Sequence, residues 1–483
     1  MNIMNENTLG INAQGLMEQA KTMVKVVEEA LEQRRAAHEV ERSLFDCALQ
    51  MGRRALGLFF QLCGNADRGE SVELPQVGRL KRLQGIHYKA YRSVFGEYAL
   101  ERVVYGIREG QKIAYVPLDE QLQLPEGKCS YLLQDWNQSL AVEMPYHQVS
   151  GVLERILGFT QSVNTLERSN AKIASSVPEY WEARAHAPAA QDKEIVVATV
   201  DCKGVVIRKA STQAEQAQLE ACNATMCGAQ QEAEDTQKKG RKKMAVIGSA
   251  YTIAPYVRTP EQVVEALFRD PQAPQEQATL RPKPLCKYIR TSLERDKFDT
   301  LKPAYEEIFG WLAKEHRQRN PQGRQPSVLL MDGQISLWQA GDEYLAEGSV
   351  IEILDLLHAT SYVWKAAAVF HPGVEAQQLI GFVKPRVARI LNGEVNAVIR
   401  GFKAMGTRYG LSGKRLKKLE TICGYFENNA QRMRYDEYLA VGYPIATGVI
   451  EGACRHVIKD RMERSGMRWT LPGAQAMLGL RCT

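Results

Sequence analysis

Two short runs of mostly apolar residues, far apart in the chain, each end directly in an aspartate. The run Ile195–Val200 leads into Asp201, and the run Ser327–Met331 leads into Asp332. Continuous apolar runs of this length are typical of strands that are buried on both faces of an α/β sheet. The ends of neighbouring strands lie within a few ångströms of each other. The pattern therefore predicts that Asp201 and Asp332 converge.

The residues around these runs predict more of the same domain. We expect a turn at Gly204 into a strand at Val205–Arg208, and further strands at Met244–Ile253 and Val350–Leu354. Thr259 is followed by Pro260 and by Gln262, which is a helix start with a capping box. Other helices are expected around residues 303–317 and through His358 to Phe370, and the basic remainder from Glu375 onwards also has a helical pattern.

The N-terminal part has a different pattern. Residues 12–62 lack proline and repeat apolar positions at helical spacing, which predicts long helices that could pair chains. Residues 72–119 predict a small sheet-containing module. Two helical stretches, Val149–Leu157 and Ser162–Ser175, flank Gly158 in the manner of a helix-turn-helix, although a helical pair in an ordinary bundle explains them equally well.

The composition favours a globular protein with several domains. The chain has 483 residues, of which 45% are hydrophobic, and no apolar run of 18 residues or signal-peptide pattern is present, so we expect a cytoplasmic, nucleoid-associated protein without membrane contact. Its ten cysteines form no C-x-x-C pair and are expected to be reduced thiols. The predicted domain boundaries are 1–70 (helical), 71–190 (DNA-binding), 191–372 (first part of the core), 373–440 (helical insertion) and 441–483 (catalytic helix and tail).

The positive charge is gathered in clusters, although the net charge is only +6. One cluster lies at the end of a polar insert, which we expect to be a loop, and comprises Lys238, Lys239, Arg241, Lys242 and Lys243; a second spans 384–418. Both clusters are suited to contacting phosphates by counterion release. Solvated helix faces and a loop explain them as well.

The two aspartates need a partner, because converging carboxylates repel each other. Divalent cations such as Mg²⁺ or Mn²⁺ remove that repulsion and take oxygen ligands. Glu451 is the candidate for a third ligand, since it begins a helix whose apolar face is Ile450, Ala453, Cys454, Val457 and Ile458. The cations Arg455, Lys459, Arg461 and Arg468 would then line the approach for DNA. Taken singly, each acid also fits a turn or a helix start, so only the ordered set points to chemistry.

Several blocks resemble the ISKra group of insertion-sequence transposases. The resemblance spans about Tyr91 to Trp469 and lies in residues 201–205, 240–248, 258–260, 330–333 and, most specifically, 448–469. It implies an RNase H-like core, a mixed sheet flanked by helices, with a DDE triad on Asp201, Asp332 and Glu451. Relatives often carry a zinc ribbon before Pro117–Glu120, and this chain lacks its paired cysteines.

A second element of the resemblance follows the second aspartate. Asp355 and His358 resemble the acid, two spacers and histidine of Mutator-like and related transposases. His358 is then an auxiliary donor to DNA or to a metal-bound water, although a single helical histidine is more often structural.

These observations predict a bacterial transposase that binds the terminal inverted repeats of its element and target DNA, works with Mg²⁺ or Mn²⁺, and forms a homo-oligomer. Two alternatives remain within DNA-binding proteins: an RNase H-like nuclease that cuts without joining, and a catalytically inactive DNA-binding protein. A glycoside hydrolase also uses two carboxylates, but it needs an aromatic cleft. Only 8% of the residues are aromatic, so this class ranks last.

Overall fold

The computed structural model describes residues 6–75, 77–108, 110, 112–208, 241–269, 281–294, 303–345 and 350–483. These residues divide into two compact units, Met1–Asn170 and Ala171–Thr483. Within the described ranges, no helix combines the length and the apolar character needed to cross a bilayer. The insert that ends in Lys238 and Lys239 lies outside the described residues.

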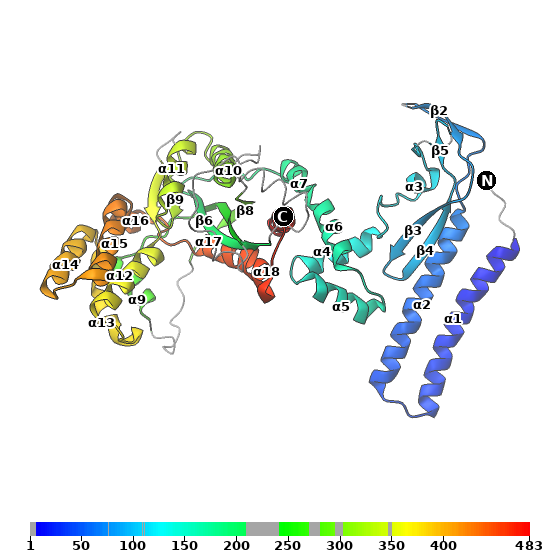
Figure 1. Cartoon of the computed structure of the whole chain (residues 1–483), viewed down its shortest axis with the longest axis horizontal. Helices are drawn as coiled ribbons and strands as arrows, with labels where there is room; N and C mark the ends of the chain where they lie inside the picture. Colours follow the sequence, from blue (N-terminus) through cyan, green and yellow to red (C-terminus); the bar gives the residue numbers. More distant parts are fainter. Residues whose placement is uncertain are drawn as a thin grey trace, which may run out of the picture. The chain divides into compact units, whose positions relative to one another are not determined.

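The first unit begins with two long helices that pack side by side, α1 (Glu6–Glu32) and α2 (Ala37–Cys63) (Figure 1). They confirm the long helices predicted from the apolar spacing. Only the four residues 33–36 connect them, so the two helices run in opposite directions as a hairpin.

Small sheets and short helices make up the rest of this unit. One sheet has the order β1 (Ser71–Leu74), β2 (Gly78–Arg82) and β5 (Tyr105–Gly106), and a hairpin pairs β3 (His87–Ser93) with β4 (Gly96–Arg102). The helices are α3 (Pro117–Gln121), α4 (Tyr131–Ala141), α5 (Tyr146–Leu157) and α6 (Val163–Ala174), which extends four residues past the division between the units. Gly158 ends α5 with a φ of 73°, which confirms the predicted turn between two helices.

A five-stranded mixed sheet forms the centre of the second unit. Its order is β10 (Val350–Leu354), β9 (Ser327–Met331), β6 (Ile195–Ile207), β7 (Arg241–Ile253) and β8 (Leu285–Leu293). β10, β9 and β6 run parallel, whereas β7 and β8 join antiparallel. The predicted strand end at Asp201 and the predicted turn at Gly204 are both wrong, because β6 continues through these residues and pairs with β7 from Ile195 to Ile207.

Helices cover both faces of this sheet. Gly248 on β7 faces α10 (Ala304–Arg319), where a Cβ atom would lie 2.6 Å from Ile308 Cγ2. Gly248 pairs with Val200, so the next residue of β6, Asp201, points to the opposite face. That face carries α17 (Gly448–Ala453), the π-helical turn Cys454–Lys459 and α19 (Leu471–Arg481) (Figure 1).

Replacing Gly248 with alanine is expected to destabilise the second unit. The added methyl group has no room against Ile308 in α10, so we expect the free energy of unfolding to fall by about 1–3 kcal/mol. Gly401→Ala in α14 is the matched control, because a Cβ there meets nothing within 4 Å and alanine favours the helix. Chemical denaturation of both variants measures the difference, and equal midpoints would contradict the expectation.

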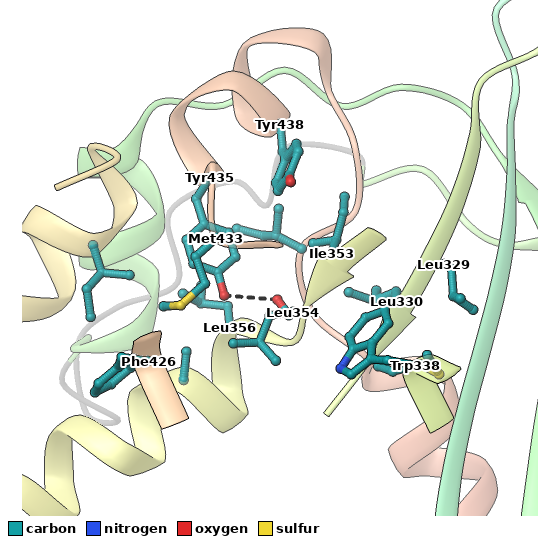
Figure 2. Packing of buried hydrophobic residues seen from close by; sticks show 14 of the residues in the cluster. Leu329, Leu330, Trp338, Ile353, Leu354, Leu356, Phe426, Met433, Tyr435 and Tyr438 are labelled. Atoms are coloured by element: carbon teal, nitrogen blue, oxygen red, sulfur yellow. Dashed lines mark hydrogen bonds between the residues drawn. The ribbon is translucent and has the colours of Figure 1, made fainter. Parts of the chain in front are cut away.

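A helical block follows the sheet and is anchored on its β10 edge. It contains α12 (Leu356–Phe370), α13 (Ala376–Leu391), α14 (Val395–Arg408), α15 (Gly413–Asn429) and α16 (Tyr435–Val441). Figure 2 shows the junction, where the Tyr435 hydroxyl donates a 2.9 Å hydrogen bond to the Leu354 carbonyl among buried side chains of β9, β10 and the block. The block thus shares one core with the sheet.

The remaining helices of this unit include the one with the predicted capping box. At the start of α9 (Pro260–Leu267), the Thr259 hydroxyl accepts from the Gln262 backbone and the Gln262 side chain accepts from the Thr259 backbone, which confirms the prediction. The others are α7 (Val177–Ala183), α11 (Ile335–Tyr344), the 3-10 turns Ala430–Arg432 and Arg464–Gly466, and α18 (Asp460–Met462).

Candidate active site

Asp201 and Asp332 occupy neighbouring positions on adjacent parallel strands. Val200 of β6 is in register with Met331 of β9, and each aspartate is the next residue. Each carboxylate is held by a nearby backbone N–H: Asp201 Oδ1 accepts from Cys202 at 2.6 Å and Asp332 Oδ1 from Gln334 at 3.1 Å. The parallel register therefore places the two aspartates next to each other, level with the C-terminal end of β9.

The helix that carries Glu451 packs on the same face as Asp201. Cys454, three residues after Glu451, donates its thiol hydrogen to Asp201 Oδ2 across 3.0 Å. Ile450 and Ala453 are buried beneath the helix, whereas Glu451 is on its exposed side. All the residues of the predicted apolar face are buried. Glu451 is close enough to Asp201 for the two negative charges to interact.

A buried aspartate links α17 to the sheet. Asp355 directly follows β10 and is 1% exposed, and its carboxylate accepts from the Leu357 backbone at 2.8 Å and from the Thr447 hydroxyl. Thr447 is the N-cap residue directly before α17, and Leu356 also donates to the Ile445 carbonyl at 2.9 Å. Together these bonds fix the entry of α17, and so the position of Glu451, relative to β10.

His358 and Tyr425 surround Asp332. His358 Nδ1 lies 3.9 Å from Asp332 Oδ2, and its side chain is half-exposed. The Tyr425 hydroxyl donates to the Asp332 backbone carbonyl at 2.9 Å, and its ring stacks on Tyr362 with centroids 3.6 Å apart. Gly333 has a φ of 93°, and a Cβ there would lie 3.0 Å from the Tyr425 ring and hydroxyl. The hydrogen bond from Tyr425 and the close approach of its ring to Gly333 thus hold the turn after Asp332 in place.

Asp332, Asp355 and Glu451 each have a raised pKa in this site. Burial raises the pKa of the Asp332 carboxyl, and the charge of Asp201 adds to the rise, while the Gln334 N–H and His358 oppose it. Burial also raises the pKa of Glu451, with further contributions from Asp355 and Asp201. Burial raises the pKa of Asp355 too, and the bond from Thr447 lowers it. The site therefore holds negative charge that its surroundings do not fully compensate.

This excess of negative charge should lower the stability of the folded protein at neutral pH. A carboxyl whose pKa is raised by folding stabilises the protein fully below its ordinary value and loses that contribution as the pH rises through its folded value. At pH 7 the ionised Asp332 therefore opposes folding, and Asp332→Asn is expected to raise the Tm of metal-free protein by about 2–4 °C. The gain should shrink as the pH falls toward the ordinary pKa of an aspartate and vanish below about pH 3, where the carboxyl is protonated in both states.

Thermal denaturation in a chelator across about pH 3–8 checks this prediction. Asp192→Asn, at an exposed position just before β6, removes the same charge outside the site and controls for net charge. A Tm at pH 7 that is lower in Asp332→Asn than in the unchanged protein would contradict it.

The donor set suits a hard divalent cation, because Asp201, Asp332 and Glu451 offer only oxygens. No group of three or more His, Cys, Asp or Glu side chains in the described ranges is placed to hold a metal ion. Asp201, Asp332 and Asp355 are neighbours across β6, β9 and β10, since Val200, Met331 and Leu354 are in register. Glu451 is on the exposed side of its helix and would have to turn inward to join them.

The predicted DNA-contacting cations fall into three groups. Arg455, Lys459, Arg468 and Lys242 are exposed, as expected for phosphate contacts. Arg461 is 0% exposed and its guanidinium lies 4.7 Å from the centre of the Trp469 ring, so the prediction that it lines the DNA approach is wrong for this conformation. Lys243 is also buried, because it lies on β7 and not in a loop. Arg241 begins β7, and its side chain is not described.

Four site residues were not singled out from the sequence for the roles they have here: Asp355 and Thr447, which join the helix to the sheet, Cys454 and Tyr425. Asp355 had a usable signal, since it directly follows a mostly apolar run as Asp201 and Asp332 do. Thr447, Cys454 and Tyr425 had none, because their partners are distant in sequence.

Comparisons with known proteins add little to this geometry. No protein-family model matches the sequence, and no curated protein matches it. Among solved structures, the Drosophila P element transposase strand transfer complex is similar at a TM-score of 0.25 and 10% identity, over 75% of this chain and 81% of that one. A TM-score this low carries no argument about fold or function.

Proposed function

We propose that this protein is a bacterial DNA transposase of the ISKra type, which binds the terminal inverted repeats of its element and catalyses metal-dependent DNA cleavage and strand transfer. The in-register pair of Val200 and Met331 carries the proposal, because it sets Asp201, within β6, beside Asp332, which follows the end of β9. The mixed sheet flanked by helices supports an RNase H-like core.

In this proposal Asp201 and Asp332 bind two divalent cations, Mg²⁺ or Mn²⁺, and Glu451 completes their ligands. Such a pair stabilises the attacking and the leaving oxygen of phosphodiester transfer. The chain itself orients the ligands: backbone N–H groups fix one oxygen of each aspartate, and the Asp355–Thr447 bond fixes the helix of Glu451. The Cys454 thiol orients the other oxygen of Asp201, which would keep a second lone pair for a cation.

The DNA contacts are assigned to two regions. The exposed cations Arg455, Lys459 and Arg468 follow Glu451 and neutralise phosphates near the strand ends. Element ends are recognised by residues before about 190, where α5 and α6 have the helix-turn-helix shape, together with the basic C-terminal helices. His358, beside Asp332, is assigned to a hydrogen bond with DNA.

The test is a reaction on the DNA that flanks the gene. The full-length protein is incubated with a duplex carrying one element end, with Mg²⁺ or with a chelator, and with a scrambled duplex as the control. We expect Mg²⁺-dependent cuts at the end and joining of pre-cut ends to a target. Cutting without joining would identify the nuclease alternative, and specific binding without cutting the inactive DNA-binding protein.

A further inference from the structure

α1 displays a second apolar stripe beside the one that packs on α2. The first stripe, which is buried or half-buried, is Leu16, Gln19, Met23, Val26 and Ala30. The second is shifted by one residue and consists of Met17, Ala20, Val24, Val27 and Leu31. Its large side chains are all exposed: Met17 is 65% exposed, Val24 57%, Val27 48% and Leu31 81%. An ordinary surface helix does not keep apolar side chains this exposed in a regular row.

The spacing of the second stripe is that of a coiled-coil seam. Its residues alternate steps of three and four, which is the heptad pattern that keeps one seam facing a partner helix. The first stripe has the same spacing and already has such a partner in α2. The second stripe is therefore shaped for another helix of the same kind.

α2 contributes to the same surface. Its apolar residues Phe45, Phe59 and Leu62 are also exposed, with Ala48 and Ala55 at matching heptad spacing between them. Gly52, at the heptad position between the two alanines, is covered by the Phe95 ring, so the row is open on either side of this position. This row, too, lies one residue after the stripe that packs on the other helix. Because the helices run in opposite directions, the same one-residue step turns both exposed rows to one side of the hairpin.

The charges beside the seam point to a copy of the same helix as the partner. The outer border of the α1 seam is charged at every position, with Glu18, Lys21, Lys25, Glu28 and Glu32. Lys21 and Glu28 occupy equivalent heptad positions next to the seam and carry opposite charges. When two α1 helices lie antiparallel with Val24 opposite Val27, Lys21 of each meets Glu28 of the other.

We propose that this face of the α1–α2 hairpin binds the same face of a second copy of the chain and forms a four-helix bundle, with the α1 helices antiparallel and centred between Val24 and Val27. A hairpin with two exposed heptad rows buries both of them in such a bundle. The pairing surface lies within the first unit, and the three acidic residues lie within the second. A protein that dimerises but does not cleave DNA would therefore contradict the proposed function alone. A monomer that cleaves DNA would contradict the pairing surface alone.

Sedimentation of the full-length protein over a range of concentrations tests the seam. We expect a dimer for the unchanged chain, and for Val24→Glu combined with Val27→Glu a dissociation constant at least about 100-fold higher. Both positions are exposed, so the variant should keep the circular dichroism spectrum of the unchanged protein. Thr22→Glu, on the exposed side of α1 away from the seam, is the matched control and should remain dimeric.

Charge reversals test the antiparallel alignment. Lys21→Glu and Glu28→Lys should each weaken the dimer about tenfold, and combining them should restore it, because the pair is then inverted but complementary. A monomer at all concentrations, or a dimer that the Val24 and Val27 substitutions leave intact, overturns the pairing surface. Single charge reversals without effect overturn the antiparallel arrangement.

Discussion

Asp332→Asn is expected to lower the rate of Mg²⁺-dependent cleavage of end-containing DNA by about 1,000-fold or more. Asparagine keeps the shape of the side chain and can still accept from the Gln334 N–H, but it removes one negative charge from the strand ends. Asp201 and Glu451 would then be the only carboxylates of the proposed triad left to hold the cations. The expected loss is therefore in the chemical step, while the fold and the binding of DNA remain.

Single-turnover cleavage of a labelled duplex measures this loss, with DNA binding followed separately by anisotropy. Asp192→Asn removes an equal charge at an exposed position outside the site and should cleave at the unchanged rate. Cleavage by Asp332→Asn at the rate of the unchanged protein would remove the basis of the two-cation assignment. Loss of binding together with cleavage would point instead to a structural role for Asp332.

The positions of the two aspartates were predictable because the signal is local. A buried strand needs a continuous apolar run, and β6 and β9 supply one each before their aspartates. β8 was not predicted, because it lacks such a continuous apolar run. It lies at the sheet edge with Leu285, Cys286 and Lys287 exposed, so its sequence does not have the pattern of a buried strand.

Burial of charged residues was less predictable than strand position. Arg461 follows Arg455 and Lys459 in a run that suggests a basic helix face, yet its guanidinium is buried over Trp469 and contacts Met467. An arginine can be buried when its flat cationic group stacks on a ring. The sequence places Trp469 only eight residues away, but the chain must turn back before they meet.

The bond between Thr447 and Asp355 could not be predicted, because its two residues are 92 positions apart. Thr447 begins the helix of Glu451, and Asp355 follows the strand beside Asp332. Both groups are buried, so removing the hydroxyl leaves the carboxylate with one donor fewer where water cannot replace it. This makes Thr447 a positioning residue, acting through α17 on Glu451.

Thr447→Val should therefore reduce both stability and cleavage. Valine has the size of threonine but donates no hydrogen bond, so we expect the free energy of unfolding to fall by about 1–3 kcal/mol. A shift of the α17 entry should also slow cleavage by about 10- to 100-fold and raise the Mg²⁺ concentration needed for half-maximal rate, because Glu451 no longer reaches the cations in the right geometry.

Thr447→Ser separates positioning from general stability, because serine keeps the hydroxyl and loses only a methyl group. We expect Thr447→Ser to restore the Mg²⁺ dependence and most of the cleavage rate even where its unfolding midpoint stays below that of the unchanged protein. Denaturant unfolding and Mg²⁺ titration of single-turnover cleavage give the two readouts. If Thr447→Val is less stable but cleaves with unchanged Mg²⁺ dependence, the buried bond supports the fold alone and does not orient Glu451.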